Sequence, residues 1–398
     1  MIPKGFKVGG VAAGISSKKG KLDLSLFIST VPAVSAAMFT SNVVKAAPVL
    51  FDIELSKNAG KISGIIANSG CANACTGNLG LKNVSKMVLS VEKTFKLAAN
   101  SVFCASTGII GQHIILSGLP KAIVYLKETV GSSKENEESA VLGIMTTDTA
   151  IKKASKTINI DGKDITIWGC VKGSGMICPD LKAFHATMLS FVLTDAAISK
   201  SSLQKVLSCA ADMSFNCVTI DGDTSTNDTL IALANGQSGA KPLSGKNLET
   251  FAKAFNELCL QLAKGMAKDG EGATKFIEIE VKNAKSKENA KAIASSIALS
   301  PLFKTAMFGA DANWGRILSA AGKAGVNFDP AKTDIHIAGF QTFHKGKPVK
   351  FSEQAIKKEL LKNEIKICVD LRSGKAMSKY YTCDFSYDYV KINGDYRS

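Results

Sequence analysis

A long run of helical periodicity that changes within a few residues to strand periodicity constrains the fold of this chain most strongly. Over residues 248–266, apolar side chains recur at the i, i+3, i+4, i+7 spacing of a helix with one buried face, and Gly270 follows as a stop signal. Over residues 276–281, apolar residues alternate with glutamates, which predicts a strand with one solvated face. The same alternation returns over residues 365–371. A chain that mixes these periodicities is expected to form layers of helices and sheets.

Elements of both kinds are also predicted upstream. Residues 64–67 form a short apolar run that suits a buried strand, and residues 82–98 have the pattern of an amphipathic helix. Ser201 and Gln204 offer a capping box for a helix that continues to Ala210. We therefore predict an α/β fold of layered helices and antiparallel or mixed sheets. The length of 398 residues suggests two or three structural units that pack closely.

The formal net charge of +15 raises the question of nucleic-acid binding, because polyanions are bound through neutralised phosphates. Only three of the 49 basic residues are arginines, whereas proteins that bind phosphates and bases favour the arginine fork. A lysine-rich solvated surface is the preferred interpretation. The sequence has neither a long apolar run nor a secretory signal, so we expect no membrane association and a cytoplasmic location.

The cysteines and histidines do not form a pattern that predicts a metal site. Ten cysteines without a signal peptide indicate reduced thiols, and the pair Cys71 and Cys75 has no matching second pair at zinc-site spacing. The four histidines are scattered and form no HExxH motif. No metal is therefore expected.

Two polar segments resemble binding loops only in composition. Residues 221–228 carry oxygen side chains at alternate positions, but Thr226 and Ala232 stand where a calcium loop needs glycine and glutamate. A turn stitched by side-chain hydrogen bonds, or an active-site wall, is the better interpretation. Residues 172–176 are glycine-rich, but their order does not match a phosphate-binding loop, and no dinucleotide-binding motif is present.

Two short segments could supply catalytic donors or play purely structural roles. In Ser106-Thr107-Gly108, a hydroxyl stands beside a glycine amide, and such a pair of donors can stabilise a developing oxyanion. Small-residue turns of this kind are more often structural. Thr146-Thr147-Asp148 either lines a pocket or caps a helix.

Taken together, the motifs resemble those of the ornithine acetyltransferase family, which includes bifunctional glutamate N-acetyltransferases. The resemblance extends over the whole chain and is carried by residues 4–6, 67–77, 106–108, 145–149, 172–177, 186–189, 221–228, 269–275 and 311–316. It implies a self-processing ArgJ/DmpA-like fold of the N-terminal-nucleophile type. It also implies cleavage between Ala186 and Thr187, which gives an α chain of residues 1–186 and a β chain of residues 187–398. The new α-amine of Thr187 would then act as the general base for its own hydroxyl.

The implied reaction is transfer of acetyl from N-acetyl-L-ornithine to L-glutamate through an acetyl-Thr187 intermediate, in arginine biosynthesis. The resemblance assigns the oxyanion hole to Thr107 and Gly108 and substrate binding to Thr147, Lys172, Thr187, Glu271, Asn393 and Ser398. It implies no cofactor, with acetyl-CoA as a possible second acetyl donor, and a heterotetramer of two α and two β chains. Lys172 and Glu271 suit this assignment, because an amino acid brings a carboxylate and an ammonium that each need an opposite charge.

The sequence departs from the family pattern before the nucleophile and at its end. Residues 179–187 are four residues longer than the usual Pro-Asn-Met-Ala-Thr, and Ser398 stands where threonine is also common. Two other functions compete with the acetyltransferase. One is an N-terminal-nucleophile aminopeptidase or amidase, which would hydrolyse its substrate. The other is a basic binding protein without self-cleavage, which would bind nucleic acid in a salt-sensitive way.

Overall fold

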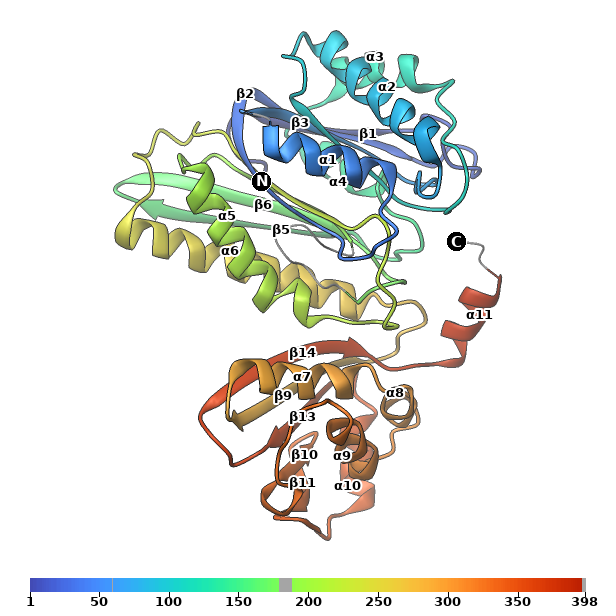
Figure 1. The fold of residues 1–398 in the computed structure, drawn as a ribbon, viewed down its shortest axis with the longest axis vertical. Helices are drawn as coiled ribbons and strands as arrows, with labels where there is room; N and C mark the ends of the chain where they lie inside the picture. The colour runs from blue at the N-terminus through green and yellow to red at the C-terminus, as the bar shows by residue number, and fades with distance from the viewer. Residues whose placement is uncertain (59, 179–187, 396–398) are drawn as a thin grey trace. The chain divides into compact units, whose positions relative to one another are not determined.

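The computed structural model describes residues 1–58, 60–178 and 188–395, and this part of the chain forms two compact units (Figure 1). Unit 1 comprises Met1–Asn216 and Asp223–Met266, and unit 2 comprises Cys217–Gly222 and the described residues from Ala267 onward. No helix in the described ranges combines the length and the apolar character needed to cross a bilayer.

Unit 1 is built on a mixed eight-stranded sheet. Its strand order is β4-β3-β2-β8-β7-β6-β5, with β1 paired to β2. The pairs β3/β4 and β7/β8 are parallel, and the other pairs are antiparallel. The strands are β1 (Phe6–Val11), β2 (Leu24–Phe39), β3 (Ile62–Asn68), β4 (Val102–Ser106), β5 (Lys152–Ile160), β6 (Lys163–Lys172), β7 (Leu189–Thr194) and β8 (Thr229–Ala234).

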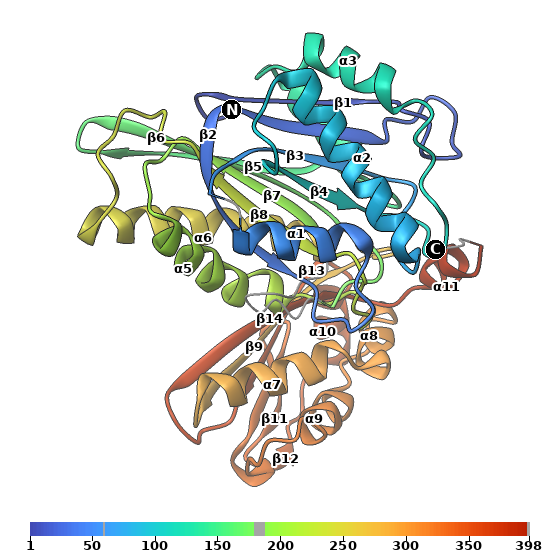
Figure 2. The same ribbon diagram turned by 45° about the horizontal axis from the view of Figure 1, so that its top comes forward.

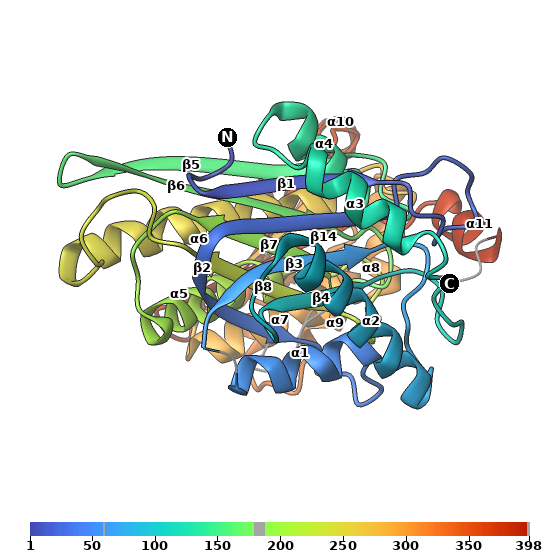
Figure 3. The same ribbon diagram turned by 90° about the horizontal axis from the view of Figure 1, so that it is seen from above.

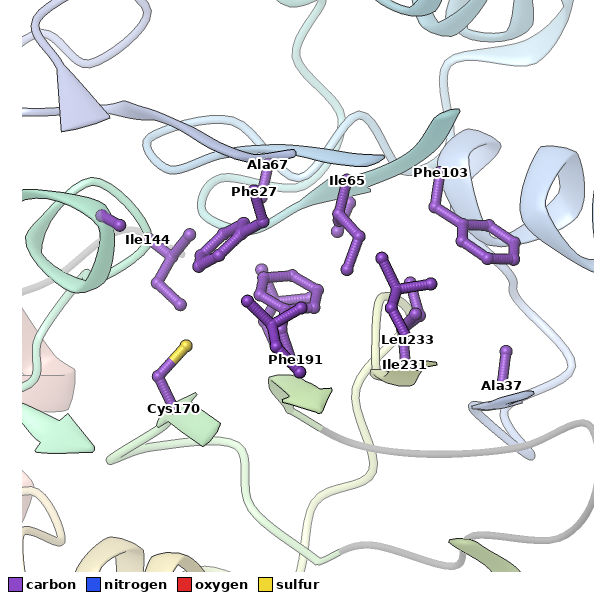
Figure 4. Packing of buried hydrophobic residues seen from close by; sticks show 14 of the residues in the cluster. Phe27, Ala37, Ile65, Ala67, Phe103, Ile144, Cys170, Phe191, Ile231 and Leu233 are labelled. Atoms are coloured by element: carbon purple, nitrogen blue, oxygen red, sulfur yellow. The ribbon is translucent and has the colours of Figure 1, made fainter. Parts of the chain in front are cut away.

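The long strand β2 connects two layers of this sheet. Its first half pairs with β1 and β3, its second half pairs with β8, and the register shifts between Ile28 and Ala33. Apolar side chains from both layers meet between them, among them Phe27 and Phe191, whose ring centroids lie 4.9 Å apart (Figure 4). Because β3 is covered on both faces, its short apolar run is wholly buried.

Helices cover the outer faces of the two layers (Figures 2 and 3). On the layer of β1, β3 and β4 lie α2 (Gly77–Phe95) and α3 (Leu119–Thr129), whose apolar faces share a buried cluster with β2 and β3. On the other layer lie α5 (Lys200–Met213) and α6 (Gly245–Lys268). Two further helices, α1 (Ala47–Asn58) and α4 (Lys134–Leu142), pack on β4 and β1. Unit 1 is thus a four-layer arrangement of helix, sheet, sheet and helix.

Unit 2 is a second layered structure, with a six-stranded sheet in the order β12-β11-β10-β13-β9-β14. Its strands are β9 (Phe276–Ala284), β10 (Asp334–Ile337), β11 (Phe340–His344), β12 (Lys347–Pro348), β13 (Glu364–Asp370) and β14 (Ala376–Cys383). α7 (Lys287–Ala298) packs on β9 and β14. The remaining helices are α8 (Pro301–Phe308), α9 (Trp314–Gly322), α10 (Glu353–Leu360) and α11 (Tyr387–Asp395), with a short 3-10 turn at Pro330–Lys332. A second 3-10 turn, Phe215–Cys217, begins in unit 1 and ends at the first residue of unit 2.

The predicted mixture of helices on mixed sheets is confirmed, as are the helices expected over residues 82–98 and 248–266. The two alternating strands are also confirmed, because Ile277, Ile279 and Val281 are fully buried while the intervening glutamates are not. The predicted cap at Ser201 is wrong. The helix begins at Lys200, and the Ser199 hydroxyl accepts the Ser202 N–H at 3.2 Å, so Ser199 occupies the capping position.

Candidate functional site

The turn that follows β4 carries the predicted oxyanion donors. The Thr107 N–H donates to the Asn68 carbonyl at 3.0 Å, which continues the pairing of β4 with β3. Gly108 has φ +129°, and a Cβ there would lie 2.4 Å from the Gly70 carbonyl carbon, so no larger residue fits. The Gly108 N–H is the next backbone donor along the chain after that of Thr107. The turn therefore presents a backbone donor next to the Thr107 hydroxyl.

Lys172, the last residue of β6, brings a cation to this turn. Its side chain is buried, and Nζ donates to Thr107 Oγ1 at 3.2 Å and to Thr146 Oγ1 at 3.0 Å. An ammonium group can only donate, so the Thr107 hydroxyl accepts this bond and its own proton is directed elsewhere. In the sheet register Lys172 lies opposite Leu189, the first residue of β7.

The Thr146-Thr147-Asp148 segment lines the same site. Thr147 Oγ1 lies 2.9 Å from Ser174 Oγ, and Asp148 Oδ1 accepts the Gly173 N–H at 2.6 Å. The alternative role of this segment as a helix cap is wrong, because the next element is the strand β5. The structure thus brings the predicted residues Thr107, Gly108, Thr147 and Lys172 together.

Two further lysines and one carboxylate set the charge of this site. Burial alone would raise the pKa of Asp148, but Lys172 and Lys152 outweigh it and lower the pKa to about 2. Lys152 Nζ lies 2.7 Å from Asp148 Oδ1. Lys21 donates to the Met145 carbonyl, and its pKa is lowered by burial and by the neighbouring Lys18 and Lys172. An ionised Asp148 among several cations leaves the site net positive, which suits a carboxylate ligand.

The polar loop of residues 221–228 contacts the turn after β4. Ser225 Oγ accepts the Asn227 N–H, and Asn227 Nδ2 donates to the Ser106 carbonyl at 2.8 Å. These bonds agree with the predicted turn held by side-chain hydrogen bonds. They also agree with the alternative prediction that this loop forms a wall of the active site. Asp228 is fully buried, and burial raises its pKa well above the ordinary range despite the opposing effect of Lys172.

Unit 2 carries two of the residues predicted to bind substrate, and they contact each other. Glu271 is buried, and its Oε2 accepts a hydrogen bond from Asn393 Nδ2 of α11 at 2.9 Å. Gly272, the next residue, has φ +66°, and a Cβ there would lie 2.4 Å from the Tyr389 backbone nitrogen. Glu271 is thus held beside α11 by a close backbone contact.

Three predicted site residues, Ala186, Thr187 and Ser398, lie outside the described residues. The sequence reasoning missed Lys21, Asn68 and Asn227, each of which contacts the site or its supporting turn. Asn68 and Asn227 belong to motifs that were singled out, but residue spacing carries no signal of which backbone groups their amides contact.

Comparison with known proteins identifies one family over almost the whole chain. The model of the ArgJ family matches residues 7–398. The "Arginine biosynthesis bifunctional protein ArgJ" of Thermotoga neapolitana is 43% identical over 405 residues, with both chains covered completely. The protein of the same name from Caldanaerobacter subterraneus is 44% identical over 407 residues and covers 100% of this chain and 98% of that protein.

A solved structure agrees with these relatives. The crystal structure of the arginine biosynthesis bifunctional protein ArgJ from Bacillus halodurans matches with a TM-score of 0.51 and 42% sequence identity. The match covers 98% of that crystallised chain but only 52% of the present one. The crystallised chain is therefore about half as long.

Proposed function

The chain belongs to the ArgJ family, and we propose that it is a self-cleaving glutamate N-acetyltransferase that moves an acetyl group from N-acetyl-L-ornithine to L-glutamate in arginine biosynthesis. Family membership rests on the match over residues 7–398. The observation that carries the chemistry is the turn after β4, where the Gly108 N–H follows a Thr107 hydroxyl that accepts a hydrogen bond from Lys172 at 3.2 Å. Two donors arranged in this way can stabilise the oxyanion of acyl transfer.

Self-cleavage would generate the nucleophile. The Thr187 hydroxyl attacks the Ala186 carbonyl carbon, and the peptide C–N bond breaks as an ester forms, which frees the α-amine of Thr187. Water then hydrolyses the ester, which releases the carboxylate of Ala186 and restores the Thr187 hydroxyl. That amine then takes the proton of the same hydroxyl when the hydroxyl acts as a nucleophile. The half-length chain of the crystallised relative supports this proposal, because a chain cut at this point would be recovered as two pieces of about that size.

Acetyl transfer would follow a ping-pong course. Thr187 attacks the acetyl carbonyl of N-acetylornithine, and the negative charge of the tetrahedral intermediate is stabilised by Thr107 and Gly108. Collapse of this intermediate expels ornithine, whose amine receives the proton. The glutamate amine then attacks the acetyl ester and restores the Thr187 hydroxyl. No cofactor is required, because each step uses only the hydroxyl, the amine and the two substrates.

The charged groups support amino-acid substrates. Lys172, Lys21 and Lys152 give the site of unit 1 a positive character that suits a substrate carboxylate. In unit 2, the buried carboxyl group of Glu271, bound by Asn393, suits a substrate ammonium group. We propose that Thr147 and Ser398 also bind substrate, because they stand at positions where members of the family hold the substrate.

A product assay tests this proposal. The purified protein is incubated with N-acetylornithine, with and without glutamate, and ornithine, acetylglutamate and acetate are quantified. The expected result is acetylglutamate in amounts equal to ornithine when glutamate is present. Acetate without acetylglutamate would identify the protein as an amidase of the N-terminal-nucleophile type and reject the transferase. The Thr187→Ala variant, which lacks the hydroxyl, should produce neither acetylglutamate nor acetate.

The relatives are named bifunctional, and we therefore include acetyl-CoA as a second acetyl donor in the proposal. Steady-state rates of acetylglutamate formation from acetyl-CoA and glutamate test this extension. We also propose that the enzyme works in the cytoplasm, where these metabolites are found, as a heterotetramer of two α and two β chains. Native mass spectrometry of the cleaved protein tests the assembly.

A further inference from the structure

Asn227 uses the NH2 group of its side-chain amide to bind two backbone carbonyls beside the predicted oxyanion hole. It is buried just before β8, and Nδ2 donates to the carbonyls of Ala72 at 2.5 Å and Ser106 at 2.8 Å. Because the two carbonyls can only accept, the NH2 end of the amide must face them, and Oδ1 accepts the Thr226 hydroxyl at 2.6 Å. Every polar atom of this buried side chain is therefore engaged.

The Ser106 carbonyl belongs to the peptide that leads into the oxyanion turn. The N–H of that peptide, on Thr107, donates to the Asn68 carbonyl at 3.0 Å, while its carbonyl accepts from Asn227. Ser106 Oγ adds a bond to Asn68 Oδ1 at 2.7 Å. Both ends of one peptide plane are thus fixed, and the next N–H along the chain is that of Gly108.

The second carbonyl bound by Asn227 belongs to the segment against which the turn packs. The Ala72 N–H donates to the Ile109 carbonyl at 3.0 Å, and the Ile109 N–H donates to the Gly70 carbonyl at 3.4 Å. One side-chain amide therefore links the segment before the turn to the segment beside it. Rotation of the Ser106–Thr107 peptide would break the bond from Asn227 to the Ser106 carbonyl or the bond from the Thr107 N–H to Asn68.

We propose that Asn227 is a positioning residue for acyl transfer, which sets the direction of the Gly108 N–H toward the oxyanion by fixing the Ser106–Thr107 peptide. This inference rests on the proposed function, since it assumes that Thr107 and Gly108 form the oxyanion hole. Asn227 would act through this peptide and not by contact with a substrate. Displacing a catalytic donor by about 1 Å can lower a rate by about 100-fold, so a residue one step removed from the hole can control turnover.

The test compares Asn227→Ala with Asn42→Ala. Asn42 provides a matched control because its Nδ2 donates to the Thr224 carbonyl at 2.8 Å, in the same loop, but no bond from it reaches the oxyanion turn. The readouts are kcat and KM for N-acetylornithine and glutamate, Tm, and the fraction of Thr187 that becomes acetylated, measured by mass spectrometry. Rates are expressed per acetylatable Thr187, so that slow self-cleavage or partial unfolding does not count as lost turnover.

The expected result is a fall in kcat of about 10- to 100-fold for Asn227→Ala, with KM within about 2-fold of wild type, because the lost interaction acts in the transition state. Asn42→Ala should keep both constants within about 2-fold, whatever its Tm. Asn227→Asp keeps the volume of the side chain but turns a carboxylate oxygen toward two carbonyls. At neutral pH, the kcat of Asn227→Asp should fall at least as much as that of Asn227→Ala. If Asn227→Ala does not fold, the kcat of Asn227→Asp tests the proposal in its place.

A wild-type kcat per acetylatable site in either Asn227 variant would overturn the inference. An equal loss of kcat in Asn42→Ala would also overturn it, because the effect would then come from general loosening of the loop. Failure of the proposed function gives a different result, since the wild-type protein would then form no acetylglutamate at all.

Discussion

The hydrogen bond from Lys172 to Thr107 fixes how the threonine hydroxyl can act. Because Lys172 Nζ occupies an acceptor site of Thr107 Oγ1 at 3.2 Å, the hydroxyl proton remains available for a substrate oxygen. The Thr107→Val variant keeps the shape of the side chain and loses this donor. We expect kcat to fall by about 100-fold, since one oxyanion donor contributes about 3 kcal/mol. Thr107→Ser, which keeps the hydroxyl, should stay within about 10-fold of wild type in the same steady-state assay.

Asp148 predicts a pH dependence of stability with a definite sign. Its pKa falls from the ordinary 3.8 to about 2 in the folded protein, so the stabilisation is complete above the ordinary pKa and is lost as the pH falls through about 2. The shift corresponds to about 2 kcal/mol. Urea unfolding should find Asp148→Asn less stable than wild type near neutral pH, with the difference narrowing between about pH 4 and about pH 2.

The exposed Asp164 on β6 provides the control for this prediction. Asp164→Asn should follow the wild-type pH profile throughout. A difference between wild type and Asp148→Asn that stayed constant down to about pH 2 would show that the lysines do not hold Asp148 ionised in the folded state.

Sequence motifs predicted several of the site residues, but they did not predict which backbone groups the side chains contact. Thr107 and Lys172 were singled out from the family motifs, and the structure places them in contact. The contact of Asn227 with Ser106 joins residues 121 positions apart, so no local pattern predicts it. The clustering of Lys21 near Lys172 also depends on the fold and was missed.

Among the elements, the turn after β4 is the one most tightly constrained by its neighbours. A Cβ on Gly108 would lie 2.4 Å from the carbonyl carbon of Gly70, and its φ of +129° disfavours any other residue. We expect Gly108→Ala to displace the turn, to destabilise the protein by about 2 kcal/mol or more, and to abolish acetylglutamate formation.

Gly111, three residues further along, gives the comparison. It also has a positive φ of +82°, but a Cβ there would meet nothing within 4 Å. Gly111→Ala should therefore cost about 1 kcal/mol and keep its activity. Thermal unfolding and the product assay measure both variants, and full activity in Gly108→Ala would remove this turn from the mechanism.

Periodicity predicted the individual elements well because it reports which face of an element is buried. The helix over residues 248–266 and the strand over residues 276–281 were confirmed for this reason. Helix caps were harder to predict, since Ser199, Ser201 and Ser202 lie close together at the start of α5 and only the backbone geometry selects Ser199. The parallel pairing of β7 with β8 and the bend of β2 between two layers depend on contacts distant in sequence and were not predicted.

For the whole molecule, the predicted cut does not coincide with the boundary between compact units. β6 lies in the predicted α chain and β7 in the predicted β chain, yet the two strands pair along Ile167–Lys172 within the sheet of unit 1. β2 and β8 likewise pair across the two predicted chains. Cleavage would therefore leave two chains that share one sheet and one core.

This interleaving predicts how the cleaved protein behaves. Denaturing electrophoresis should show two fragments, and N-terminal sequencing of one should read Thr-Met-Leu-Ser. Under native conditions the two fragments should elute together in size-exclusion chromatography. A freshly purified protein that remains a single intact chain would reject self-cleavage, and fragments that separate without denaturant would contradict the shared sheet.

The central claim is that Thr187 carries the acetyl group between the two substrates. Mass spectrometry of the protein after brief mixing with isotope-labelled N-acetylornithine tests it most directly. We expect one labelled acetyl group on the peptide that begins with Thr187, and its loss to labelled acetylglutamate once glutamate is added. A labelled product formed without any label ever appearing on Thr187, or a label on Thr187 that glutamate does not remove, would show that Thr187 is not the acetyl carrier.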